Sequence, residues 1–201
     1  MSPRRPRVAL LNPPAKDPVL RDYYCSTRPK VRYHWQPIDL LAVAARLKGD
    51  AELLIVDAVA ERLSAAALRK RVADFDPDAV LGLVSDLTRD DDLAFLVSLA
   101  RDGRRLAISG EVALDPAFDF ERWHAIDALV LDFTAPEAAA FLLGSDAEGR
   151  LRTATHAPTP PPQKGTFSLG AMPHEHLTEG FYRLPLWEGP FRSLLTDFGC
   201  P

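Results

Sequence analysis

The sequence predicts an α/β protein with a flavodoxin-like (Rossmann-like) parallel sheet of about five strands and helices on both faces. Short, continuously apolar runs alternate along the chain with segments whose apolar residues recur every three or four positions. Strict alternation of strands and helices implies parallel pairing through right-handed crossovers. The strands are apolar throughout because helices cover both faces of such a sheet.

The first strand and helix have clear boundaries. A strand at 8–11 ends at the Asn-Pro-Pro of residues 12–14, because proline has no N–H to donate within a central strand. A helix over 37–48 begins with a proline, which suits a first turn. It ends before Gly49, which suits the position just after a helix.

The same alternation continues to residue 143. The remaining elements are strands at 53–56, 79–84, 106–108 and 128–131 and helices after Ser64, over 90–101 and over 136–143. Ser64 is a typical N-cap. The acidic run at 90–92 complements the helix dipole, and Pro136 falls in a first turn.

Composition excludes several classes of function. The 201 residues are 47% hydrophobic and carry a net charge of −4, so the chain can bury one core but lacks the basic surface of a nucleic-acid-binding protein. No apolar run reaches the roughly 18 residues of a membrane span, and no apolar leader follows the N-terminus. Two cysteines are too few for a secreted disulfide framework. We expect a cytoplasmic protein without nucleic-acid or membrane partners.

The chain divides into three expected parts. Residues 1–143 form the Rossmann-like domain, 144–190 form a proline-rich interdomain linker, and 191–201 contain a lone barrel-type strand. Within the domain, the connection over 13–36 is unusually long and rich in aromatic residues. We expect it to fold as a lid over the carboxyl edge of the sheet, or else to pack on a neighbouring domain.

Ligands of such sheets bind outside the carboxyl ends of the strands, where the strand order reverses. For the expected order 2-1-3-4-5, the loops that begin at Asn12 and Ser85 line that site, and those from Gly110 and Asp132 flank it. Each residue type also has a structural role, since serine caps turns and asparagine forms Asx turns. Glycine at this edge permits its backbone to approach a ligand closely.

The last residues carry the most specific motif. Residues 195–201 read Leu-Thr-Asp-Phe-Gly-Cys-Pro, and this stretch resembles the first barrel strand of cobalamin-type radical S-adenosylmethionine enzymes. In that family the loop continues as C-x3-C-x2-C, and the three thiolates hold a [4Fe–4S] cluster. Cys200 matches the first of them. The chain ends before the other two, so we expect it to be the front part of a larger enzyme.

The order of parts is similar to that family along nearly the whole chain, from Asn-Pro-Pro after the first strand to the proline linker. The resemblance implies cobalamin over the carboxyl edge and a domain that serves an enzyme cleaving S-adenosylmethionine, with radical chemistry or methyl transfer on an unactivated carbon. The implied cofactor contacts are Asn12, Pro13, Ser85, Gly110, Glu111, Asp132 and Thr134, and the implied cluster ligand is Cys200.

The chain departs from the family pattern in two places. It lacks the D-x-H-x-x-G motif, so cobalamin would have no histidine ligand from that motif, and Glu111 replaces a second small residue after Gly110. One cluster cysteine cannot hold four irons, so we expect no catalysis from this chain without the rest of the barrel. The alternative function is a stand-alone Rossmann-like binding or interaction module without a cofactor.

Overall fold

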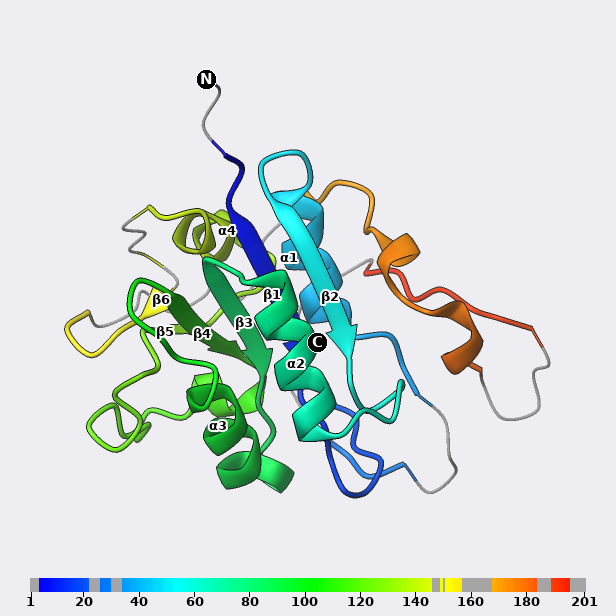
Figure 1. Cartoon of the computed structure of the whole chain (residues 1–201), viewed down its shortest axis with the longest axis horizontal. Helices are drawn as coiled ribbons and strands as arrows, with labels where there is room; N and C mark the ends of the chain where they lie inside the picture. Colours follow the sequence, from blue (N-terminus) through cyan, green and yellow to red (C-terminus); the bar gives the residue numbers. More distant parts are fainter. Residues whose placement is uncertain are drawn as a thin grey trace.

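A computed structural model describes residues 4–21, 26–29, 34–145, 149, 151–156, 168–183 and 189–195. It contains one six-stranded sheet in the order β2-β1-β3-β4-β5-β6 (Figure 1). The first five strands are parallel and β6 is antiparallel to β5. The predicted flavodoxin-like order 2-1-3-4-5 is confirmed.

The elements lie close to their predicted positions. The strands are β1 (Arg7–Asn12), β2 (Glu52–Asp57), β3 (Ala79–Leu83), β4 (Arg105–Ser109), β5 (Ala128–Val130) and β6 (Leu151–Arg152). The α-helices are α1 (Ile38–Leu47), α2 (Ala65–Phe75), α3 (Arg89–Val97) and α4 (Pro136–Leu142). The short 3-10 helices are η1 (Asp86–Thr88), η2 (Glu111–Leu114), η3 (His174–His176) and η4 (Glu179–Phe181). The Ser64 hydroxyl accepts a hydrogen bond from the Ala67 amide at 3.1 Å, as its predicted capping role requires.

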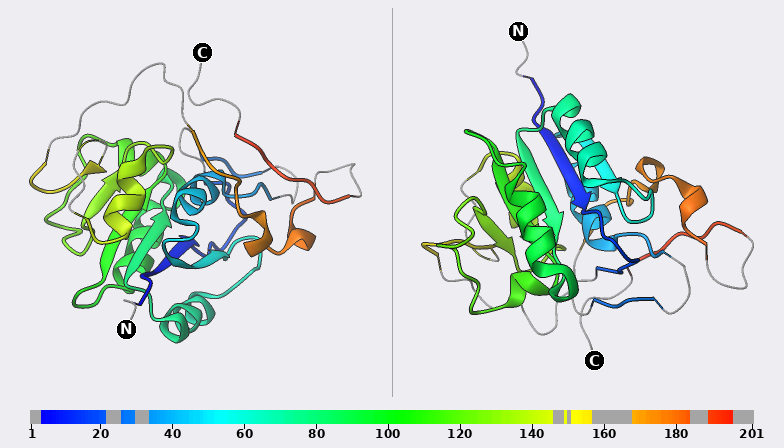
Figure 2. Two further views of the ribbon diagram at one scale, coloured as in Figure 1. Left: turned by 90° about the horizontal axis from the view of Figure 1, so that it is seen from above. Right: turned by 60° about the horizontal axis from the view of Figure 1, so that its bottom comes forward.

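Helices cover both faces of the sheet (Figure 2), and an apolar layer lies on each face. Alternate residues of the central strands face opposite sides, so Leu10 and Leu81 pack with α1 and α4, whereas Leu11 and Val80 pack with α2 and α3. All four of these side chains are fully buried. Burial on both faces explains why the strands are continuously apolar in sequence.

Residues beyond 143 contribute more to this body than their composition predicts. Leu151 is buried in β6 at the edge of the sheet. The segment 168–183 lies beside α1 and β2 (orange in Figure 1), where Leu177 and Tyr182 join the core on the α1 side. The apolar side chains of this segment therefore cover a face of the domain.

The expected barrel-type strand over 191–201 is not seen in the described part, which covers 191–195 and has no regular secondary structure. The Gln36 side chain holds this segment by donating to the Phe191 carbonyl at 3.0 Å and accepting from the Ser193 amide at 2.6 Å. Cys200 and the rest of the motif lie outside the described residues, as does Cys25. Among the helices that the structure describes, none is both long and apolar enough to cross a membrane.

Candidate functional site

The carboxyl ends of β1 and β3 form the point at which the strand order reverses. The described parts of the 13–36 loop lie against this edge, as predicted. Val19 is buried there, and a bridge between Leu20 and Thr27 closes part of the loop on itself. The loop therefore covers the crevice in which such sheets bind ligands.

Arg21 of this loop fills the crevice. Its guanidinium donates to the Asn12 side-chain oxygen at 2.8 Å and to the Pro13 carbonyl at 2.9 Å. It also forms a bidentate pair with Asp92 of α3, with N···O distances of 2.6 and 2.8 Å. Both side chains of the pair are completely buried. A fork-to-fork ion pair of this kind fixes the position of the loop over the sheet.

Asp92 is surrounded by further donors. The Thr88 hydroxyl donates to it at 2.7 Å and the Ser85 amide at 3.2 Å. Burial raises the pKa of Asp92, while the hydrogen bonds and charge of Arg21 oppose that rise. The acidic run lies in the first turn of α3, as predicted for a run that complements the helix dipole. Its last member, Asp92, also anchors the lid from the buried side of α3.

The predicted residues after β3 and β4 have structural partners within the chain. The Ser85 hydroxyl accepts from the Leu87 amide at 3.0 Å, so it caps η1. Gly110 has φ +101° and ψ −177°, and a Cβ at this position would lie 2.5 Å from the Val84 carbonyl oxygen. The close approach that glycine permits here is therefore made by the chain's own backbone.

Glu111 ties the lid to the sheet edge. One carboxylate oxygen accepts from the Ser26 amide and the other from the Asp86 amide, each at 2.8 Å. Sequence considerations placed Glu111 next to a ligand, where its size works against binding. In the structure Glu111 connects the lid to the loop after β3. This role depends on how the lid, which is distant in the sequence, packs on the sheet edge.

Asp132 and Thr134 form a local turn after β5. The Asp132 carboxylate accepts from the Thr134 amide at 2.9 Å and from its hydroxyl, the pattern of an Asx turn. The Thr134 carbonyl accepts from the Arg46 guanidinium of α1. This pair therefore joins the end of β5 to a helix on one face of the sheet.

The residues at the switch point do not fit the nucleotide tail of cobalamin in this arrangement. Arg21 fills the space between the ends of β1 and β3, and the backbone at Gly110 is already packed on Val84. A tail that entered here would have to displace a buried ion pair, which is costly because an unpaired buried charge is left behind.

A second buried carboxylate lies one strand away. The Asp57 carboxylate, at the end of β2, accepts from the Asn12 side-chain NH₂ at 2.8 Å, the Tyr182 hydroxyl at 2.9 Å and the Ala60 backbone amide at 3.1 Å. Burial raises the pKa of Asp57, and these hydrogen bonds oppose the rise. Burial also raises the pKa of Tyr182, with the charge of Asp57 adding to that rise, so the phenol stays protonated and donates. Asp57 thereby holds the 168–183 segment on the domain.

We expect Asp57→Asn to stabilise the protein at neutral pH relative to wild type. Folding raises the pKa of Asp57 above its ordinary value of 3.8, so between these two pKa values the folded state binds more protons than the unfolded state. The protein therefore loses stability as the pH rises through this window. Asparagine keeps an acceptor for Asn12 and Ala60 and presents its NH₂ to the Tyr182 oxygen.

Thermal unfolding of both proteins between pH 4 and 8 checks this expectation. The gap in Tm should open in favour of the variant as the pH rises. A variant that is less stable by the same amount at every pH would show that the charge of Asp57 carries no cost. Asp92 is present in both proteins, so its titration cancels.

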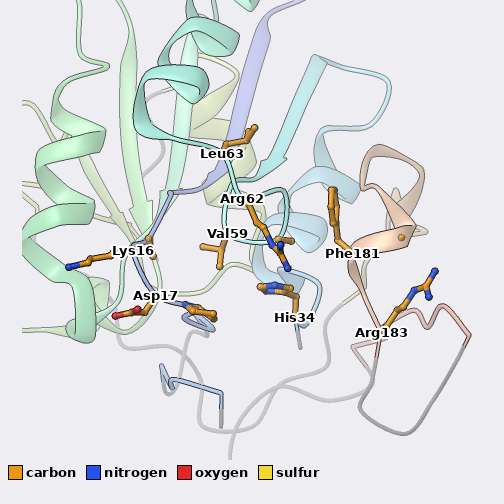
Figure 3. Close-up of a pocket in the computed structure, with 12 residues that line it drawn as sticks. Lys16, Asp17, His34, Val59, Arg62, Leu63, Phe181 and Arg183 are labelled. Carbon is orange, nitrogen blue, oxygen red and sulfur yellow. The ribbon is translucent and has the colours of Figure 1, made fainter. Parts of the chain in front are cut away.

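A pocket of about 780 Å³ opens beside the carboxyl end of β2, separate from the filled crevice. Its walls come from the lid, the turn after β2 and the η4 segment, and Figure 3 shows several of the side chains that line it. The lining residues are Ala15, Lys16, Asp17, Pro18, His34, Val59, Ala60, Arg62, Leu63, Gly180, Phe181 and Arg183. It offers cations, an imidazole and an apolar wall in one place.

Apart from the expected lid, the pocket is formed by residues that the sequence did not single out. His34, at the end of the lid, lines the pocket half-buried. No local pattern indicates Arg62 or Phe181, because they are separated by more than a hundred residues and meet only through the docking of the η4 segment.

Among the described residues, no group of three or more His, Cys, Asp or Glu side chains is placed to hold a metal ion. His174 and His176 stand at alternate positions, a spacing that can form half of a metal site. Both ring nitrogens of His174 are instead engaged by backbone carbonyls, that of Met172 at 3.0 Å and that of Ser193 at 2.9 Å. The implied cluster ligand Cys200 lies outside the part of the chain that the structure describes.

In comparisons with known proteins, no protein-family model matches the chain, and no curated protein matches it.

Proposed function

We propose that this chain is the N-terminal, cobalamin-binding-like part of a radical S-adenosylmethionine enzyme. One observation carries the proposal: a sheet in the order 2-1-3-4-5 precedes a segment that leads into Thr-Asp-Phe-Gly-Cys-Pro at 196–201. The strand order supports it, because the carboxyl edge at the switch point is where a ligand of the complete enzyme would face the domain. In this proposal the chain supplies binding and docking surfaces, and the catalytic groups belong to the barrel.

The coding sequence beyond codon 201 is the direct test. We expect two further cysteines at C-x3-C-x2-C spacing with Cys200, followed by alternating strands and helices of a barrel. In the encoded protein, Cys200→Ala should then abolish the iron–sulfur absorbance after anaerobic reconstitution. A stop codon, or a continuation without those cysteines, overturns the radical-enzyme proposal.

Cobalamin is a separate part of the proposal, and we expect weak binding at most. Hydroxocobalamin bound over this edge needs the lid to move, since Arg21 fills the crevice and Glu111 holds the lid down. Glu111→Ala removes that anchor and should tighten binding if the cofactor enters here. Glu52→Ala, an exposed residue at the opposite end of β2, is the matched control.

Titration of hydroxocobalamin followed by absorbance checks this, with a base-off spectrum as the sign of binding. A shift that is equal in wild type and Glu111→Ala would leave the cofactor but move it away from this edge. No shift in any variant, at cobalamin concentrations far above the protein, removes cobalamin from the proposal.

The second candidate is a stand-alone binding or interaction module without cobalamin. The filled crevice favours it, because Arg21 and Asp92 already satisfy the polar groups that a cofactor tail would meet. An unchanged cobalamin spectrum together with a coding sequence that lacks the cluster motif would select this candidate.

A further inference from the structure

Both cationic and apolar side chains line the pocket beside β2. Among the residues that the structure describes, three cations, Lys16, Arg62 and Arg183, and one carboxylate, Asp17, line it. Val59, Leu63 and Phe181 supply the apolar wall. Its volume of about 780 Å³ falls in the range of roughly 300–1,000 Å³ that is typical of small-molecule sites. An anionic molecule with an apolar or aromatic part matches this lining.

Arg62 occupies an unfavourable backbone conformation at the rim of the pocket. The turn after β2 ends in a Schellman motif, with the Leu63 amide donating to the Ala58 carbonyl at 2.9 Å and the Arg62 amide to Val59 at 3.2 Å. Arg62 sits at the left-handed position of this motif with φ +53°, where glycine is the usual residue. An arginine kept in this conformation at a pocket favours the hypothesis that its side chain has a function there.

The side chain of Arg62 reaches toward His34 within the pocket (Figure 3). Burial lowers the pKa of His34, Asp57 opposes this, and the charge of Arg62 lowers it further. The imidazole and the guanidinium lie next to each other in the pocket, and both can donate N–H groups to one ligand (Figure 3). Such a pair suits the oxygens of a phosphate group, which accept charge-assisted hydrogen bonds from arginine.

Phe181 stands across the pocket from Arg62 (Figure 3). Its side chain is 38% exposed although it belongs to a segment that covers the core. A partly exposed ring in a pocket offers a face for a flat heterocycle, and such stacking contributes strongly to the binding of nucleobases.

We propose that this pocket binds a nucleoside phosphate, with the phosphate at Arg62 and His34 and the base against Phe181. The site lies beside β2, apart from the switch-point crevice. It therefore stands or falls independently of cobalamin and of the radical-enzyme proposal.

Isothermal titration of the 201-residue chain with ADP, pyrophosphate and adenosine tests the proposal. We expect ADP to bind more tightly than either part alone. Arg62→Gly should weaken ADP and pyrophosphate by at least about tenfold, the effect of losing one hydrogen bond to a charged group. Phe181→Ala should weaken ADP and adenosine and leave pyrophosphate unchanged.

The chain contains a matched control for Arg62→Gly. Asp76, the C-cap of α2, is the other non-glycine residue with positive φ among the described residues, at +50°. Asp76→Gly relieves the same backbone strain outside the pocket, so it should leave ADP binding unchanged. Arg62→Gly should keep or raise the Tm, which separates lost binding from lost folding. Absence of ADP binding to wild type, or equal ADP affinity in Arg62→Gly and wild type, overturns the proposal.

Discussion

Replacing Arg21 by alanine is expected to lower the free energy of unfolding by about 3–5 kcal/mol, because the change leaves the Asp92 carboxylate buried without its cation. The same change removes the donors to Asn12 and Pro13. Urea denaturation at pH 7 measures the loss. The lid should also become the first site of proteolysis, since this pair holds it against the sheet.

Two controls separate the buried charge from the loss of packing. The double variant Arg21→Met/Asp92→Leu removes both charges and should recover most of the lost stability, as replacement of buried ion pairs by apolar residues often does. Arg4→Ala breaks an exposed pair with Asp78 and should cost less than about 1 kcal/mol. A double variant as unstable as Arg21→Ala would show that the hydrogen bonds, rather than the charge, dominate.

Gly110→Ala is expected to be similarly damaging, with a loss of about 3 kcal/mol or more in the free energy of unfolding. Its backbone, at φ +101° and ψ −177°, lies in a region that essentially only glycine adopts, at a cost of roughly 1–3 kcal/mol for other residues. The added Cβ would also lie 2.5 Å from the Val84 carbonyl oxygen, so the backbone has to shift.

Gly49→Ala is the matched control, because Gly49 also has positive φ, at +95°, but has no neighbouring atom within 4 Å of the new Cβ. It should cost only the conformational part, about 1–2 kcal/mol. The difference between the two variants measures the close approach of the β3 and β4 loops. Equal losses in the two variants would show that the close contact at Gly110 contributes nothing to the free energy of unfolding. A large loss at Gly110 also means that bulky substitutions there report on folding and not on ligand exclusion.

Several features of the fold could be predicted because they depend on local chemistry. Ser64 caps α2, Pro136 begins α4 and the apolar runs form the parallel strands, since capping, proline geometry and burial on both faces act within a few residues. The strand order also predicted which loops lie at the point where the order reverses. The sixth strand was missed, because two residues carry no recognisable period.

The contacts at the candidate site were not predictable in the same way. Arg21 reaches Asp92 across 71 positions, and Tyr182 reaches Asp57 across 125. Neither residue differs in its local sequence from an ordinary surface arginine or core tyrosine. Their roles depend on how the lid and the 168–183 segment pack on the sheet, which no periodicity describes.

The sequence by itself determined the α/β class, the strand order and the edge at which polar residues gather, because hydrophobic period, caps and chain direction encode these locally. Only the tertiary structure decided that the switch-point crevice is filled by Arg21 and that an open, cation-lined pocket lies beside β2. The physical reason is that a buried charge must be paired, and the residue that pairs with it is set by contacts between segments that are distant in the sequence.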